Sequence, residues 1–407
     1  MLGLNLSSKK EHQYMLFDIG SASVGVGIAV SVDNDLKLVW TKRFEYGYQS
    51  NDDYNRYVRT MYATLLEAGM KLTSEGFKEA VKVAPMFSIK HAEVYCLVSP
   101  PWVMSSMQQQ SETKEKLFQV SESSITELQN TCLKDMFNKQ EIVSWQELMG
   151  TPAVLEAYPD VVRLEGYQVQ TFEHRVVHEL SAQFYLSVVS ESVQKHIKEV
   201  LERVLPNHDI HFSSSAKIFS SRVHTNGNGR RRRAVFFEIG GEITTIGNVQ
   251  QGILSNCTTV ALGTNHVLKA IAPKAQSAKE ARSSLDIFHK KNQSDVSFES
   301  IPEHVRGALV EWKDAVTKSI RTLSLGVTPP TDMHILVEHS WFLLYKIALE
   351  LPWELPGVRK VVGVHVEQVY PKKNTDVHTD DIRLKVFASV LHNCTSKNTM
   401  CYTKHTI

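Results

Sequence analysis

The first regular pattern along the chain is an alternation of apolar and small residues. In SVGVGIAV, Val24, Val26, Ile28 and Val30 are separated by single small residues, which is the period of a β-strand. The next residues, VDND, supply a turn, and LKLVW supplies a second apolar run. Residues 14–40 are therefore predicted to form a β-hairpin or a pair of strands.

Apolar residues that recur every three or four positions predict helices elsewhere. These helices are expected at about 54–68, 191–205, 303–324 and 380–391. Short apolar runs predict strands at 93–99, 234–239, 244–249 and about 252–254. Near the end of the chain, HILVEHS is expected to form a strand and turn, WFLLYKIALE a buried helix, and VRKVVGVHV a further strand.

One segment interrupts this order of strands and helices. Residues 103–150 are rich in Ser, Gln, Glu and Thr, with helical spacing around Ile125, Leu128 and Leu133, and two strand candidates follow in DVVRLEGYQV and AQFYLSVVS. This block is interpreted as a subdomain inserted into a first lobe. The expected division is 1–102 and 190–233 for the first lobe, 103–189 for the insertion, 234–378 for the second lobe, and 379–407 for a C-terminal helix and polar tail.

Composition sets broad limits on the class of protein. A chain of 407 residues with 42% hydrophobic and 22% charged residues is typical of a globular protein of two or three domains. Its net charge of +1 gives no global electrostatic attraction to nucleic acid or to anionic membranes. We find neither a signal-peptide core nor a run of about 18 apolar residues. Five scattered cysteines without a Cys-x-x-Cys pair indicate a reducing compartment.

Two similar segments carry the candidate chemistry. In both MLFDIGSASVGVGIAV and AVFFEIGGEITTIGNV, an apolar strand leads into a carboxylate, one further residue and a glycine, and a second strand follows. A tight turn of this kind presents backbone N–H groups to a phosphate, and glycine allows close approach. The carboxylate is suited to hold hydrated Mg²⁺. Two copies about 220 residues apart predict two loops that grip phosphates across a cleft.

On these residues the sequence resembles the actin-like ATPase superfamily, and within it the FtsA and PilM group. The resemblance implies an α/β, actin-like (ribonuclease H-like) two-lobed fold with an inserted α+β subdomain in the first lobe. It assigns ATP and Mg²⁺ as ligands, with Asp18 and Glu238 as candidate metal ligands. The residues of the two phosphate loops are Asp18, Gly20, Ser21 and Ala22 in the first, and Glu238, Gly240 and Gly241 in the second. TVALGTNHVLKAIA, residues 259–272, is similar to the segment after the second loop, in which a glycine precedes a helix.

Five positions depart from the family pattern, among them Glu238, which stands where the second loop usually begins with Asp. Glu338 and His339 stand where the resemblance implies a glycine pair beside adenosine, so side chains would project into that pocket. The second loop carries Glu242 where a small residue is usual and Thr245 where an acid is usual, and Glu242 would repel a phosphate. Arg282 is similar to the family's basic residue near the ribose or adenine, although a solvated helix charge is an equally good interpretation. We therefore predict weak or lost ATP binding and negligible turnover.

The resemblance implies two functions from different classes. The first is a cytoplasmic scaffold that binds the cytoplasmic tail of a membrane protein in type IV pilus assembly or cell division, with self-association left open. The C-terminal LHNCTSKNTMCYTKHTI has neither an apolar stripe nor a basic face, so recruitment to the inner face of the membrane through a partner is expected, without direct insertion. The alternative is an ATP-dependent small-molecule kinase of the same superfamily, which needs a general-base Asp. We find no convincing signature for one.

Overall fold

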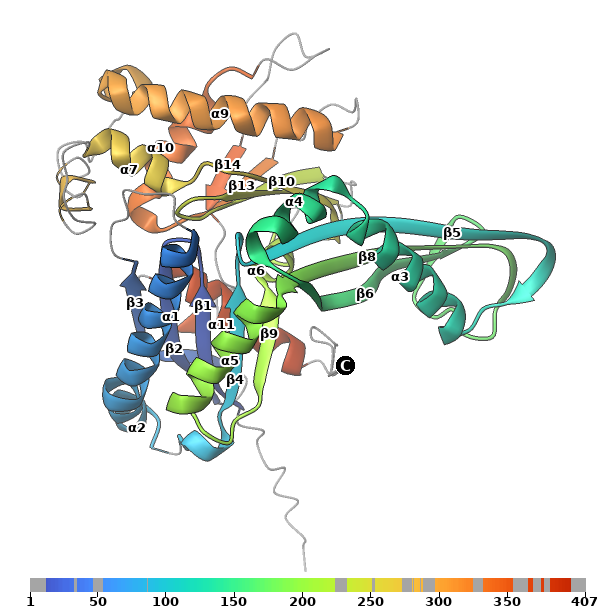
Figure 1. Ribbon diagram of the computed structural model, residues 1–407, viewed down its shortest axis with the longest axis horizontal. Coiled ribbons are helices and arrows are strands. Elements are labelled where there is room, and N and C mark those ends of the chain that lie inside the picture. Colours follow the sequence, from blue (N-terminus) through green and yellow to red (C-terminus); the bar gives the residue numbers. More distant parts are fainter. Residues whose placement is uncertain are drawn as a thin grey trace, which may run out of the picture.

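In the computed structural model the chain forms two lobes and a sheet that projects sideways from them (Figure 1). The structure describes residues 12–32, 35–46, 54–85, 87–223, 233–250, 253–272, 280, 282–285, 287, 297–324, 332–353, 365–368, 375–376 and 381–396. Most of the basic stretch RVHTNGNGRRRR, most of VRKVVGVHV and most of the expected polar tail lie outside the described residues. Within the described residues no helix is long and apolar enough to cross a membrane.

The first lobe is built on a six-stranded sheet. Its order is β15 (Thr375–Asp376), β3 (Asp35–Glu45), β2 (Ser23–Val32), β1 (His12–Ile19), β4 (Glu93–Val98) and β9 (Ile210–Ser214). The predicted strand pair is confirmed as β2 and β3, which are joined antiparallel; β1 pairs antiparallel with β2 and parallel with β4. The expected second lobe ran to residue 378, but Thr375–Asp376 already pairs with β3 in the first-lobe sheet.

Helices cover both faces of this sheet, which explains why β1 is almost continuously apolar. Met15, Phe17 and Ile19 share one buried cluster with residues of α1 (Tyr54–Lys71) and α5 (Glu191–Val204). Tyr14 and Leu16 pack on the opposite face with residues of α6 (Ser215–Ser220) and α11 (Ile382–Ser396). The predicted helix at 54–68 continues through a π-helical turn, η1 (Leu72–Gly76), into α2 (Phe77–Val83).

The second lobe repeats the arrangement with five strands. Their order is β12 (Ile253–Val260), β11 (Thr244–Gln250), β10 (Arg233–Ile239), β13 (Asp332–Leu336) and β14 (His365–Gln368). One face packs against α7 (Thr264–Ile271), α9 (Glu303–Ser324) and α10 (His339–Glu350), around the buried Trp312 and Trp341. The opposite face, with Ala234 and Phe236, shares a cluster with α6 and α11, so these two helices pack against both lobes.

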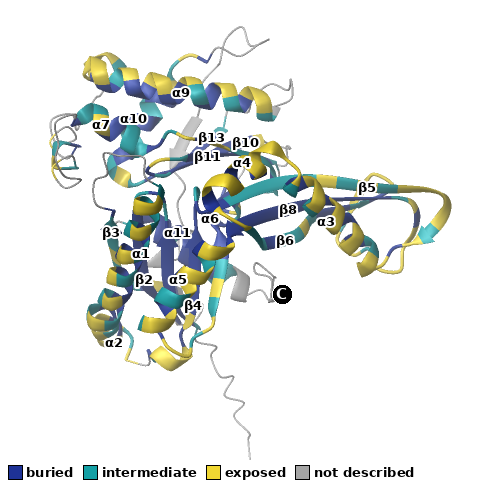
Figure 2. Ribbon diagram, in the orientation of Figure 1, coloured by how far each residue is buried: buried dark blue, intermediate teal, exposed yellow. Residues whose placement is uncertain are grey.

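The projecting unit is a four-stranded antiparallel sheet with helices on one face. Its order is β5 (Val103–Gln119), β8 (Val176–Ser190), β6 (Pro152–Leu164) and β7 (Tyr167–Val169), with helices α3 (Glu122–Phe137) and α4 (Gln140–Met149). The interior of its sheet is buried although its rim is exposed (Figure 2). The sequence did not predict β5, because its half-exposed edge position lets Ser, Gln, Glu and Lys fill most of its length.

Candidate functional site

The two predicted phosphate loops lie against each other at the junction of the lobes. Asp18 and Glu238 are each one residue from the end of a central strand, paired with Gly25 and Thr245 of the returning strands. The backbone N–H of Glu242 donates to Ser21 Oγ at 3.0 Å. A Cβ placed on Gly241 would lie 2.2 Å from Ala22 Cβ. The loops therefore touch each other directly, and glycine at 241 is needed because of that contact.

Aromatic side chains fix the first loop through its carbonyl groups. Tyr46 Oη and Trp102 Nε1 each donate to the carbonyl oxygen of Gly20 at 2.8 Å. Tyr57 Oη donates to the carbonyl of Ser21, and the Tyr57 ring stacks on Trp102 with centroids 4.8 Å apart. Nothing local in the sequence ties Tyr46, Tyr57 and Trp102 to the loop, so the sequence does not predict their role.

The second loop is fixed by the start of α7. The backbone N–H groups of Thr264 and Asn265 donate to the carbonyls of Gly240 and Gly241, both at 2.8 Å. Asn265 Nδ2 also donates to Glu242 Oε1 at 2.6 Å. The first amides of α7 are thus occupied by the protein's own carbonyls, and the carboxylate of Glu242 has a polar partner.

Asp18 is fully buried and bound by two arginines. Arg383 of α11 makes a bidentate pair with it, from Nε to Oδ2 at 2.7 Å and from Nη2 to Oδ1 at 2.9 Å. Arg43 of β3 adds a third bond, from Nη2 to Oδ2 at 2.8 Å. Burial alone would raise the pKa of Asp18, but the two guanidinium groups outweigh it and hold the pKa at about 2.

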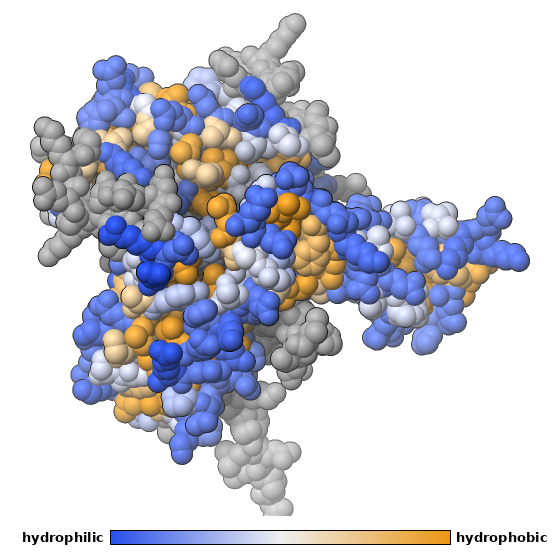
Figure 3. Space-filling view, in the orientation of Figure 1, coloured by the Kyte–Doolittle hydropathy of each residue, from blue (hydrophilic) through white to orange (hydrophobic). Residues whose placement is uncertain are grey.

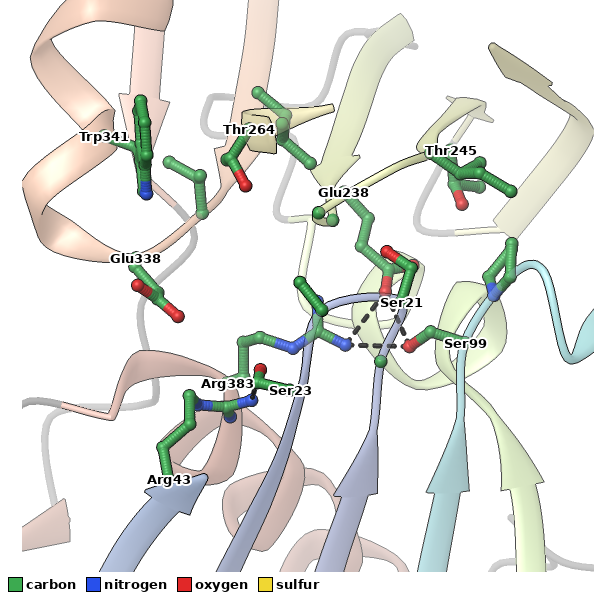
Figure 4. A pocket seen from close by; sticks show the side chains of 18 of the residues that line it. Ser21, Ser23, Arg43, Ser99, Glu238, Thr245, Thr264, Glu338, Trp341 and Arg383 are labelled. Atoms are coloured by element: carbon green, nitrogen blue, oxygen red, sulfur yellow. Dashed lines mark hydrogen bonds and ion pairs between the residues drawn. The ribbon is translucent and has the colours of Figure 1, made fainter. Parts of the chain in front are cut away.

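Arg383 also reaches the second candidate metal ligand. Its Nη2 lies 3.0 Å from Glu238 Oε1 and 2.8 Å from Ser99 Oγ (Figure 4). Glu238 is 2% exposed and further accepts from Ser99 Oγ at 3.0 Å and from Ser215 Oγ at 2.7 Å. A single guanidinium therefore bridges the two carboxylates that the sequence assigns to Mg²⁺.

A third carboxylate completes this group of charges. Asp381, just before α11, accepts from Arg43 Nε at 2.9 Å and Arg43 Nη2 at 3.0 Å, while Arg43 Nη1 donates to Ser23 Oγ at 2.9 Å. We call this group the arginine cluster; its members are Asp18, Arg43, Glu238, Asp381 and Arg383. The one local signal for it is that the run IRLKVF at the start of the final helix places Arg383 and Lys385 between apolar residues.

The residues expected beside adenosine form a second ion-paired group at the same pocket. Arg282 Nη1 lies 2.9 Å from Glu338 Oε2, and Arg282 Nε pairs with Glu45. Burial acts to raise the pKa of Glu338, yet the charge of Arg282 keeps it below its ordinary value. His339 is the first residue of α10. The structure thus brings Arg282 and Glu338 together, along with both loops, Thr245 and Trp341, around one pocket (Figure 4).

In this arrangement the candidate metal ligands do not fit Mg²⁺. Both oxygens of Asp18 and one oxygen of Glu238 accept bonds from Arg383, and Mg²⁺ demands near-ideal octahedral oxygen coordination. Two positive ions at the same carboxylates would repel each other strongly. The carboxylates can accept a metal only if the guanidinium of Arg383 moves away.

The ion pairs of Asp18 predict a specific acid sensitivity. Because its folded pKa of about 2 lies below the ordinary value of 3.8, its contribution to stability is present above pH 3.8 and is lost as the pH falls toward 2. The difference corresponds to about 2 kcal/mol. Between pH 3.8 and pH 2 the free energy of unfolding of the wild type should fall by about 2 kcal/mol more than that of the Asp18→Asn variant. Urea unfolding of both proteins measures the difference. Parallel pH profiles would contradict the assignment.

No family model and no curated protein matches this sequence. Among solved structures, one from a PilM–PilN type IV pilus biogenesis complex matches with a TM-score of 0.58 at 12% identity, over 95% of this chain and 98% of that chain. The ethanolamine utilization protein EutJ from Carboxydothermus hydrogenoformans matches at TM-score 0.42 and 8% identity, over 93% and 90% of the two chains. A Bacteroides thetaiotaomicron protein with an actin-like ATPase fold matches at TM-score 0.40 and 7% identity, over 95% and 99%.

The first of these matches covers both lobes and the projecting sheet of this chain, since it extends over nearly the whole length of both proteins. The actin-like, two-lobed α/β fold predicted from the sequence is confirmed, and so is the likeness of the fold to the PilM-like group.

Proposed function

We propose that this protein is a cytoplasmic actin-like scaffold that binds the cytoplasmic tail of a membrane protein and has given up tight nucleotide binding. The observation that carries the proposal is the position of Arg383, bonded to both Asp18 and Glu238. The chain supplies its own cation at the point where an actin-like ATPase needs Mg²⁺.

Phosphoryl transfer at this site would lack the metal ion on which it depends. Phosphoryl transfer depends on metal ions that bridge the phosphate oxygens and neutralise the developing charge. A guanidinium that is already bonded to two buried carboxylates cannot take that role. Direct contact between the loops at Ser21 and Glu242, and at Ala22 and Gly241, also opposes the entry of phosphates between them.

Contacts of the projecting sheet support a scaffold role. Gln183 of β8 donates to the carbonyls of Leu254 and Ser255 in the second lobe, at 3.4 and 3.2 Å. On the first-lobe side, the buried Glu156 of β6 accepts from Ser213 Oγ at 2.7 Å and from the backbone N–H of Ser214 at 3.2 Å, both in β9. The sheet is therefore bonded to both lobes, which suits a protein that presents a fixed surface to a partner.

The partner is proposed from the fold. The structure with the TM-score of 0.58 comes from a complex of PilM with PilN, and by analogy we propose the cytoplasmic tail of a pilus or division membrane protein as the partner here. Binding to such a tail would hold the protein at the inner face of the membrane. Whether copies of the chain also associate is a separate question that sedimentation can answer.

Titration with Mg·ATP separates the scaffold from the alternative small-molecule kinase. We expect calorimetry on the purified wild type to give no saturable heat up to about 1 mM ligand, which corresponds to less than about 4 kcal/mol of binding free energy. The same experiment with Arg383→Ala tests whether the guanidinium is what excludes the nucleotide. Micromolar affinity in the wild type, or turnover of ATP with a small acceptor, would refute the scaffold assignment.

A further inference from the structure

Exposed apolar side chains concentrate at one end of the first lobe. The structure describes eleven large apolar residues with high exposure, and four of them lie between residues 70 and 89. They are Met70 at the end of α1, Val81 and Val83 on α2, and Ile89 in the short helix η2 (Ile89–His91), with exposures of 50%, 48%, 59% and 39%. Single exposed apolar residues are common, but a group of four in twenty residues calls for a physical explanation.

These residues belong to one compact end of the molecule. The helix of α1 continues through η1 into α2, so Met70 and Val81 lie on one nearly continuous helix. A turn closed by the bond from Phe87 N–H to the Ala84 carbonyl at 2.8 Å then leads to η2. The rings of Phe77 and Phe87, 6.0 Å apart, pack the two segments together.

Lysines surround the apolar residues. Lys78, Lys82 and Lys90 are all exposed, and Lys78 and Lys90 make no ion pair within the described residues. Only two carboxylates lie in the same stretch: Glu79 pairs with Lys82, and Glu75 is shared by Lys42 and Lys71. We call this surface the basal patch; it consists of Met70, Lys78, Val81, Lys82, Val83, Ile89 and Lys90. Residues 70–90 carry four lysines and two carboxylates, although the whole chain is nearly neutral.

The basal patch lies at the pole of the first lobe farthest from the second lobe, and α2 is its most exposed part (Figures 1 and 2). At that end apolar and hydrophilic surfaces are interspersed (Figure 3). Apolar side chains that can enter the headgroup layer, together with unpaired lysines, are the combination that attracts a protein to anionic lipids. We infer that the basal patch docks on an anionic membrane surface. The contact is shallow and reversible, since four side chains bury little area.

The inference does not depend on the proposed partner tail, and vesicles without protein test it separately. We expect the purified chain to float with phosphatidylcholine vesicles that contain about 30 mol% phosphatidylglycerol, but not with phosphatidylcholine alone. Salt at about 1 M should release it, because the Debye length falls to about 3 Å. Failure to bind anionic vesicles at about 0.05 M salt would overturn the proposal.

Matched variants locate the contact. Lys78→Glu with Lys90→Glu should weaken vesicle binding at least about 20-fold, because each lysine near an anionic surface contributes about fivefold. Val81→Ser with Val83→Ser and Ile89→Ser should weaken binding while leaving the melting temperature unchanged. The control carries three changes on the projecting sheet at residues that are at least as exposed, Leu117→Ser, Tyr167→Ser and Val176→Ser, and should bind as the wild type does. Equal behaviour of the two serine triples would also overturn the proposal.

Discussion

Replacing Arg383 with alanine is expected to lower the free energy of unfolding by about 3–5 kcal/mol, which is the usual penalty for removing one partner of a buried ion pair. The change leaves Asp18 at 0% exposure and Glu238 at 2% with their bonds to α11 lost. Arg43 remains beside Asp18, so the charge that is left uncompensated lies mainly on Glu238. The guanidinium also packs over the ring of Phe219 at 4.8 Å, and this contact is lost as well. Denaturant unfolding of the two purified proteins measures the difference.

The same variant should acquire a dependence on divalent cations. Once the guanidinium is gone, the two buried carboxylates face each other across the space it filled, and Mg²⁺ can restore the missing charge. We expect Mg²⁺ to raise the melting temperature of Arg383→Ala and to leave that of the wild type unchanged. Arg321→Ala, an exposed arginine on α9, is the matched control and should change neither property.

Two outcomes would count against the arginine cluster as described. A loss of stability under about 0.5 kcal/mol would place Arg383 among ordinary surface residues. If Arg383→Ala fails to fold, a triple variant decides the matter: Arg383→Met with Asp18→Asn and Glu238→Gln should recover most of the lost stability, since these three charges are removed together and Arg43 keeps its ion pair with Asp381. A triple variant that is as unstable as the single one would show that packing, and not charge, explains the effect.

Local patterns were enough to predict the loops. Each carboxylate–x–glycine turn is specified by residues within a few positions of one another, and the flanking strands are recognisable because burial on both faces makes them apolar. The pairing of the two loops was also predictable, because the resemblance to a known fold supplies the symmetry that sequence spacing alone does not.

The guanidinium that lies between the two carboxylates was not predictable, because Arg383 comes from the far end of the chain. Arg383 is separated from Asp18 by 365 positions and from Glu238 by 145. An arginine on a terminal helix is usually interpreted as a surface charge, and only the placement of α11 under the first-lobe sheet shows otherwise. The charges of Glu242 and Glu338 predict a weakened nucleotide site from local residues, whereas Arg383, which bonds to both candidate metal ligands, does not stand out in the sequence.

The packing of α11 between the lobes and the position of the arginine cluster are connected. The helix buries Leu384, Val386 and Phe387 in the cluster shared by both lobes, and its first turn carries Arg383 into the junction. Burial of the apolar face of α11 is therefore sufficient to position the guanidinium of Arg383. An internal cation fixed in this way stabilises the contact between the lobes permanently, whereas a bound nucleotide would do so only at sufficient concentration.

Replacing Gly263 with alanine is the second change with a large expected effect. This glycine precedes α7, and a Cβ there would lie 2.4 Å from the carbonyl oxygens of both Gly240 and Gly241. Neither oxygen can move freely, because each accepts a bond from the first amides of α7. The second loop must therefore shift or release α7. We expect a loss of about 3 kcal/mol in the free energy of unfolding, from overpacking together with weakened hydrogen bonds.

Gly307→Ala is the matched control, because it is an exposed glycine inside α9 with nothing within 4 Å of the added Cβ. Alanine has the higher helix propensity, so this variant should be more stable than the wild type by up to about 1 kcal/mol. Opposite signs for the two substitutions would show that the close approach at Gly263, and not the loss of glycine as such, determines the result. If Gly263→Ala and the wild type unfold at the same midpoint denaturant concentration, the second loop is not packed on α7 as described. The packing that holds the second loop against the first would then be absent.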